Sequence, residues 1–242
     1  MTRPQWTAAG GRPAGVGGTV RCDLRRRPSL ADLGDVRDGG ARLGNVLGVE
    51  GESMVGFGYK QAWLAIRDGQ EASVVDALGL RDLGPVSWRD GIDLAYLTDD
   101  RVVLTPQLPG AGESRWLLVT GRWLFGPGAA VDVAELSSVL GTEVQFFATY
   151  RVGEAHRWER AVDGRLVRAF GYVGESGEVT DWRGEPDAAE AAIGIVRAPR
   201  DAETDILVSE DDVMRLAGAW SVDPSVLGAK PSPGPLRAAA AP

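Results

Sequence analysis

Apolar residues recur along the middle of the chain in two segments that share one order of patterns. In each segment an apolar run is followed by helical spacing and then by several short apolar runs. Spacing near 3.6 residues predicts a helix, and short alternating or continuous apolar runs predict strands. The predicted strands lie at 62–66, 86–88, 92–96, 102–104, 115–124, 144–152, 156–161 and 165–173, and the predicted helices at 71–80 and 132–140.

Turn and cap residues support several of these boundaries. Asp-Gly pairs at 90–91 and 163–164 predict tight hairpin turns, because both residues tolerate positive φ angles. Asp132 is placed to cap the start of the second helix, and Gly141 is placed to end it.

Two further helices are predicted after the last strand, within residues 186–227. The first covers about 186–195. The second begins at Ser209, whose hydroxyl suits a helix N-cap, and is followed by three carboxylates that favour the positive end of a helix dipole.

These elements predict an α+β fold built from two pseudo-repeated units, residues 55–110 and 111–175. We expect an extended, mostly antiparallel sheet with helices on one face, in a single domain over residues 54–227. Residues 1–53 are rich in Gly, Arg and Pro, which predicts disorder or an upstream extension ahead of Met54. A disordered tail is expected over 228–242.

The formal net charge of −8 argues against nucleic acid as the main partner, because phosphate binding needs a basic surface. It is compatible with a basic protein partner. Arginines outnumber lysines strongly, since Lys60 and Lys230 are the only lysines among 26 basic residues. This skew is typical of a GC-rich bacterial genome, so arginine abundance alone carries little functional weight.

Cys22 is the only cysteine, which excludes an internal disulfide and fits a reducing cytoplasm. No long apolar stretch predicts a membrane span, and the N-terminus lacks the apolar core of a signal peptide. We therefore expect a cytoplasmic protein.

Most motifs that carry chemistry are missing. One His and one Cys cannot form a tetrahedral zinc site. The glycines at 56 and 58 lack the third glycine of a dinucleotide-binding loop, and no phosphate-binding loop or nucleophile elbow occurs. The sequence therefore predicts no metal and no cofactor, with a carboxylate-only magnesium or calcium site as the open alternative.

His156 is the best catalytic candidate that the sequence offers. In a strand it would share one face with Glu154, whose carboxylate could orient the imidazole for acid–base work. Glu175, in the acidic loop after the last strand, is a second carboxylate for the same site. The alternative is an ordinary strand residue paired across the sheet.

Eight tryptophans are many for this length. Three of them lie near predicted turns or among charges, next to arginines, and could form a binding surface. The candidate binding residues are Trp88, Arg157, Trp158, Trp182 and Arg183. The alternative for each tryptophan is packing in the core.

Two functions follow. The favoured one is a non-catalytic bacterial protein that binds another protein, of the immunity, antitoxin or adaptor type, through a sheet face with exposed Trp and Arg. The alternative is a small hydrolase or transferase with His156 as general acid or base.

Overall fold

The structure is a computed structural model that describes residues 51–126, 131–197 and 206–241. The predicted N-terminal extension lies almost wholly outside these residues. The strands in the described part are β1 (Ala62–Arg67), β2 (Arg81–Val86), β3 (Arg101–Leu104), β4 (Leu108–Pro109), β5 (Arg115–Thr120), β6 (Val144–Tyr150), β7 (Ala155–Val162), β8 (Arg165–Val173), β9 (Glu178–Arg183) and β10 (Leu236–Ala240). The α-helices are α1 (Glu71–Ala77), α2 (Trp88–Leu97), α3 (Val133–Leu140), α4 (Ala188–Ala192) and α5 (Glu210–Trp220).

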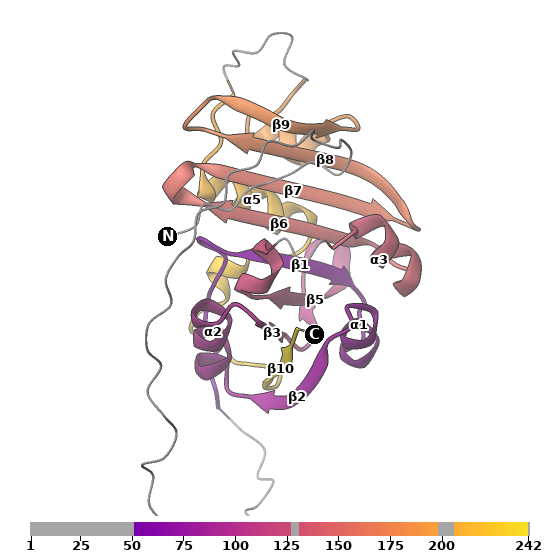
Figure 1. The fold of residues 1–242 in the computed structure, drawn as a ribbon, viewed down its shortest axis with the longest axis vertical. Coiled ribbons are helices and arrows are strands. Elements are labelled where there is room, and N and C mark those ends of the chain that lie inside the picture. Colours follow the sequence, from indigo (N-terminus) through magenta and orange to yellow (C-terminus); the bar gives the residue numbers. More distant parts are fainter. Residues whose placement is uncertain (1–50, 127–130, 198–205, 242) are drawn as a thin grey trace, which may run out of the picture. The chain divides into compact units, whose positions relative to one another are not determined.

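The ten strands form one open sheet in the order β2-β10-β3-β5-β1-β6-β7-β8-β9, with β4 paired to β5 outside this path (Figure 1). All neighbouring strands are antiparallel. The strands β6 to β9 are adjacent in sequence and in space, whereas β1 lies between β5 and β6. The predicted α+β class and the mostly antiparallel sheet are confirmed.

Helices cover both faces of the sheet, so the prediction of helices on one face is wrong. One buried cluster joins Leu64 and Leu117 to side chains of α1 and α3. A second cluster joins Trp63 and Phe147 to side chains of α2 and α5. Adjacent strand residues point to opposite faces, and β1 is buried at five of its six positions. A continuous apolar run such as 62–66 is typical of a strand covered on both faces.

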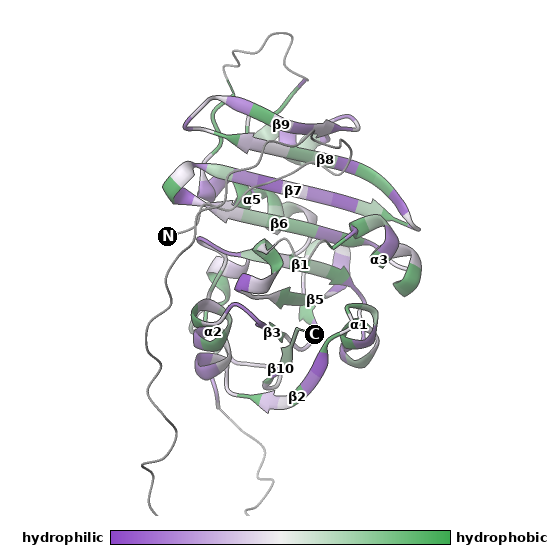
Figure 2. Cartoon of the chain, viewed as in Figure 1, coloured by the Kyte–Doolittle hydropathy of each residue, from purple (hydrophilic) through white to green (hydrophobic). Residues whose placement is uncertain are grey.

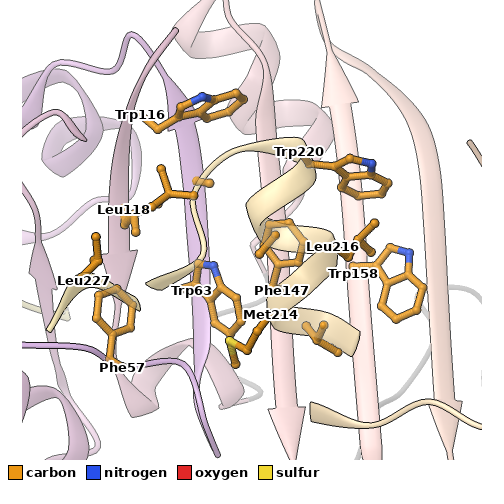
Figure 3. Packing of buried hydrophobic residues seen from close by; sticks show 14 of the residues in the cluster. Phe57, Trp63, Trp116, Leu118, Phe147, Trp158, Met214, Leu216, Trp220 and Leu227 are labelled. Atoms are coloured by element: carbon orange, nitrogen blue, oxygen red, sulfur yellow. The ribbon is translucent and has the colours of Figure 1, made fainter. Parts of the chain in front are cut away.

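Aromatic side chains fill the layer between the sheet and α5 (Figure 3). Trp63 stacks on Phe147 with ring centroids 5.2 Å apart, and Trp220 of α5 lies 6.0 Å from the same phenyl ring. Figure 2 shows hydrophobic residues along β1 and β5 and a run of hydrophilic ones through the middle of β7. The middle strands therefore contribute mainly apolar side chains, whereas the meander of β6 to β9 also buries polar ones, such as His156 and Arg168.

The segment that the sequence assigned to a hairpin and a strand is the helix α2. Ser87 caps it, because the Ser87 hydroxyl accepts a hydrogen bond from the Asp90 backbone N–H. The buried residues Trp88, Ile92 and Ala95 follow helical spacing. The hairpin signal at 90–91 was misleading because Asp90 serves the helix cap instead of a turn.

The two predicted repeats do not emerge from the structure. Both segments begin with a strand and a helix, namely β1 and α1 in the first and β5 and α3 in the second. They then diverge, because α2 follows β2 in the first segment whereas β7 follows β6 in the second. The two segments therefore share an order of apolar runs but fold into different successions of strands and helices.

The predicted disordered tail contains an interior strand of the sheet. β10 pairs with β2 on one side and with β3 on the other. Its Ala238, Ala239 and Ala240 are almost fully buried. An alanine run has low strand propensity by itself, and β10 is instead stabilised by its two neighbours.

Several local signals are confirmed. Asp132 caps α3 through two backbone N–H groups, and Gly141 ends it in the left-handed conformation. The 163–164 turn joins β7 to β8 with both residues at positive φ. Ser209 forms a capping box at the start of α5. Among the described residues, no helix is both long and apolar enough to cross a membrane.

Candidate functional site

Two of the tryptophans proposed for a binding surface are fully buried. Trp88 lies on the covered face of α2, and its indole N–H donates to Ser232 and to the Gly234 carbonyl. Trp158 lies on the face of β7 that belongs to the buried cluster with side chains of α2 and α5. The prediction that these side chains are exposed is wrong, because both belong to the core.

Trp158 also belongs to a buried polar network. Its indole N–H donates to Glu190 Oε1 at 2.7 Å, and Arg168 Nε lies 2.8 Å from the same oxygen. Glu190 is fully buried and Arg168 almost so. The Arg168 guanidinium also lies 4.3 Å from the Trp182 ring centroid, within range of a cation–π interaction. This network ties β7 and β8 to α4.

The remaining binding candidates lie on opposite faces of the sheet. Trp182, in the edge strand β9, pairs with Phe170 and is half-buried on the face that also carries the cluster with α2 and α5. Arg183 follows it in the strand and so points to the other face, where Arg157 pairs with Glu159. The predicted Trp and Arg residues therefore do not form one continuous surface.

His156 lines an open pocket of about 500 Å³, here called the His156 pocket. His156 is the second residue of β7. Most of the other lining residues belong to the start of α5 and to the segment just before it. The other lining residues are Tyr59, Arg151, Glu154, Tyr172, Leu207, Val208, Ser209, Glu210, Asp211 and Asp212.

The His156 side chain is nearly enclosed, at 3% exposed, and its Nδ1 atom has no hydrogen-bond partner among the described residues. Burial lowers the pKa of His156 below 6.5, although the nearby carboxylates of Glu210 and Asp212 act in the opposite direction. The imidazole is therefore mostly neutral at pH 7 and has one nitrogen able to accept a proton or a hydrogen bond.

Glu210 is the most constrained carboxylate of the pocket. Its Oε1 atom accepts the Lys60 backbone N–H at 3.0 Å and the Thr149 hydroxyl at 2.8 Å. Thr149 pairs directly with His156 across β6 and β7, which brings the carboxylate close to the imidazole. The cap at Ser209 fixes the first turn of α5 and thereby the position of Glu210.

The two carboxylates predicted to assist His156 have different positions. Glu154 lines the pocket, but it precedes β7 in a left-handed conformation and does not share the strand face of His156. Glu175 lies exposed in the turn between β8 and β9 and is not among the lining residues. Of the two predicted carboxylates, only Glu154 lies in the same pocket as His156.

The sequence analysis missed the contributions of α5 and of the segment before β1. Tyr59 donates its hydroxyl hydrogen bond to Asp211 Oδ1 at 2.9 Å, which joins the two sides of the pocket. Tyr172, which pairs with His156 in the sheet, forms part of the wall. The acidic run at 210–212 is visible in the sequence, but the favourable position of these carboxylates at a helix start explains it there, so the sequence alone does not indicate its place in the pocket.

Comparison of the chain with protein-family models gave no match, and comparisons with curated proteins and with solved structures gave none either. The functional inference therefore depends on the geometry of the pocket.

A second pocket, of about 650 Å³, lies beside α1. Its Arg237 is bound by Glu71 and Asp82 at 2.7 and 2.6 Å, so these charges already satisfy one another. The described residues contain no group of three or more His, Cys, Asp and Glu side chains arranged to hold a metal ion. The His156 pocket is the stronger candidate for a functional site.

Proposed function

We propose that the protein is a non-catalytic binding protein whose His156 pocket takes a positively charged group from a protein partner. The observation that carries this proposal is the charge of the lining. Four carboxylates, those of Glu154, Glu210, Asp211 and Asp212, line the pocket together with a single arginine, Arg151. A cation is the group that such a lining stabilises best.

The charge of the whole chain supports the same proposal. A net charge of −8 attracts a basic partner and increases its rate of association. A partner of this kind fits a protein of the immunity, antitoxin or adaptor type. In this proposal the α5 end of the molecule replaces the Trp and Arg sheet face as the main contact, because Trp88 and Trp158 are buried.

Catalysis has weaker support in the geometry. A general base is normally oriented by a hydrogen bond to a second group. Among the described residues, none forms a hydrogen bond with Nδ1 of His156, and the neighbouring Thr149 hydroxyl is engaged with Glu210. The pocket has charge suited to binding and lacks an oriented catalytic pair.

The test is affinity capture with the full chain, followed by native mass spectrometry. We expect one stoichiometric basic protein on the wild-type chain and its loss from the double variant Glu154→Gln/Asp211→Asn. Glu135→Gln is the matched control, since Glu135 is an exposed carboxylate in the first turn of α3. A partner that binds all three proteins equally would refute a role for the pocket.

A second function, a small hydrolase or transferase, is favoured by one observation. His156 is neutral at pH 7 and lies in a pocket beside Glu154, so it could accept a proton from a bound substrate. Turnover of an ester or phosphoester panel by the wild-type chain, abolished in His156→Gln, would favour this function over binding. Equal residual rates in both proteins would remove it.

A further inference from the structure

The His156 pocket holds unused hydrogen-bond acceptors, and their arrangement narrows the class of cation. This inference rests on the proposed function and goes further, because it names the chemical group that is bound. The first acceptor is the imidazole of His156, which is almost fully buried and lines the pocket. Its Nδ1 atom is itself buried and has no hydrogen-bond partner among the described residues. A buried polar group without a partner is unusual in a folded protein and calls for an explanation, of which a bound ligand, ion or water molecule is one.

The second acceptor is the free side of Glu210. Its Oε1 atom is fully engaged by Lys60 and Thr149, which hold the carboxylate in one orientation. Its Oε2 atom has Arg151 Nε at 4.0 Å, too far for a hydrogen bond. One oxygen of Glu210 is thus held in place and the other can accept a donor.

The third acceptor is Asp211 at the rim. Tyr59 engages Oδ1 of this carboxylate, and no described residue donates to its Oδ2. Asp212, in contrast, is committed, because it caps α5 and pairs with Arg215. The acceptors available to a ligand therefore belong to His156, Glu210 and Asp211, together with Glu154, whose carboxylate also lines the pocket.

The rest of the lining suits a flat cation on an apolar stem. The aromatic rings of Tyr59 and Tyr172 are part of the wall, and aromatic faces attract guanidinium groups. Leu207 lines the pocket while 84% exposed, so it can cover the methylene groups of an inserted side chain.

We propose that the His156 pocket binds the guanidinium group of an arginine side chain presented by the protein partner. Glu210 and Asp211 accept N–H groups from two edges of the guanidinium, and the His156 imidazole accepts a third. Arginine has five donors in a rigid plane, which matches acceptors on three separate side chains better than the compact ammonium of lysine does.

His156 itself supplies the readout, because it is the only histidine in the chain. Its imidazole therefore gives a single set of NMR signals, which can be followed in the full-length protein at pH 7.5. The probes are arginine blocked at both ends as N-acetyl-arginine methylamide, and the equally blocked lysine and citrulline. Citrulline keeps the planar shape of arginine but has no charge.

We expect a saturable shift of the His156 signal with blocked arginine, at least about fivefold weaker binding of blocked lysine, and no shift with citrulline. Glu210→Gln should lower the affinity for blocked arginine about tenfold, through loss of a charge-assisted hydrogen bond. Asp211→Asn, at an exposed position that leaves the core intact, should also weaken binding. The control Glu135→Gln should change nothing.

The outcomes separate this inference from the proposed function. Equal binding of lysine and arginine would overturn the guanidinium assignment and leave a general cation pocket standing. Equal binding of citrulline would overturn both. If no probe shifts the signal, the guanidinium assignment is wrong, and the capture experiment alone then decides the proposed function.

Discussion

The buried pair of Arg168 and Glu190 allows a sharp test of what holds the meander to α4. Glu190 is fully buried and accepts hydrogen bonds from Arg168 Nε at 2.8 and 2.9 Å on its two oxygens. It also accepts the Trp158 indole N–H and the Asp187 backbone N–H. Replacing Glu190 by Gln preserves the shape and removes the charge, which leaves the buried guanidinium without a counter-ion.

Removing one partner of a buried ion pair destabilises a protein by about 3–5 kcal/mol, because the other charge remains uncompensated. We therefore expect each of Glu190→Gln and Arg168→Met to lower the free energy of unfolding by about this amount. The double variant removes both charges, and a glutamine at 190 can still accept the Trp158 N–H. We expect the double variant to be about 2 kcal/mol more stable than either single variant.

The assay is urea unfolding followed by circular dichroism, with two-state analysis of all three variants. Arg237→Met is the matched control. Arg237 is also a strand arginine held by carboxylates, but it is about one-third exposed, so its loss should cost no more than about 1 kcal/mol. Single variants within about 1 kcal/mol of wild type, or strictly additive effects, would refute the reasoning.

Three further predictions concern other parts of the fold. Burial lowers the pKa of His156, so the unfolded chain binds a proton on this ring more tightly than the folded chain does. The contribution of the neutral, buried ring to stability is therefore complete above pH 6.5 and is lost as the pH falls. Relative to His156→Gln, the wild-type chain should lose stability as the pH falls below 6.5, by at most about 1.4 kcal/mol per pH unit, and parallel curves would contradict this. Gly184→Ala should lower the melting temperature more than Gly141→Ala does. Both glycines have positive φ, but only a Cβ atom at 184 would collide with a neighbour, the Val167 carbonyl. Equal melting temperatures of the two variants would argue against the collision. A chain that ends at Gly234 lacks β10 and should show no cooperative unfolding, unlike one that ends at Ala241; a cooperative transition in the shorter chain would show β10 to be dispensable.

The sequence predicted best those elements whose signals are local. Asp132 and Gly141 delimit α3, and the 163–164 turn sets the hairpin of β7 and β8, because each depends on a few adjacent residues. The segment that became α2 is compatible with both periodicities. Ile92 and its alternate neighbours suggest a strand, yet Ile92 also lies one helical turn from Trp88. Only the packing of that helix against β3 and β10 decides between the two.

The candidate site was predictable in part for a similar reason. His156 could be selected because it is the only histidine, and Glu154 because it is close in sequence. Glu210 and Asp211 reach the pocket from a helix more than fifty residues later along the chain, and their position follows from the docking of α5 on the sheet. The burial of Trp158 likewise depends on α4, which covers it only in the folded state.

The position of β10 has a consequence for how the chain acquires its structure. β2 and β3 are synthesised early, yet the strand that fills the space between them is the last described element to be made. Until it arrives, both early strands expose unpaired backbone edges that favour association with other chains. The meander of β6 to β9 needs only neighbouring segments and can form sooner. We therefore expect the nascent protein to depend on chaperones mainly through its first half, and a bulky fusion placed directly after β10 to delay the closure of the sheet.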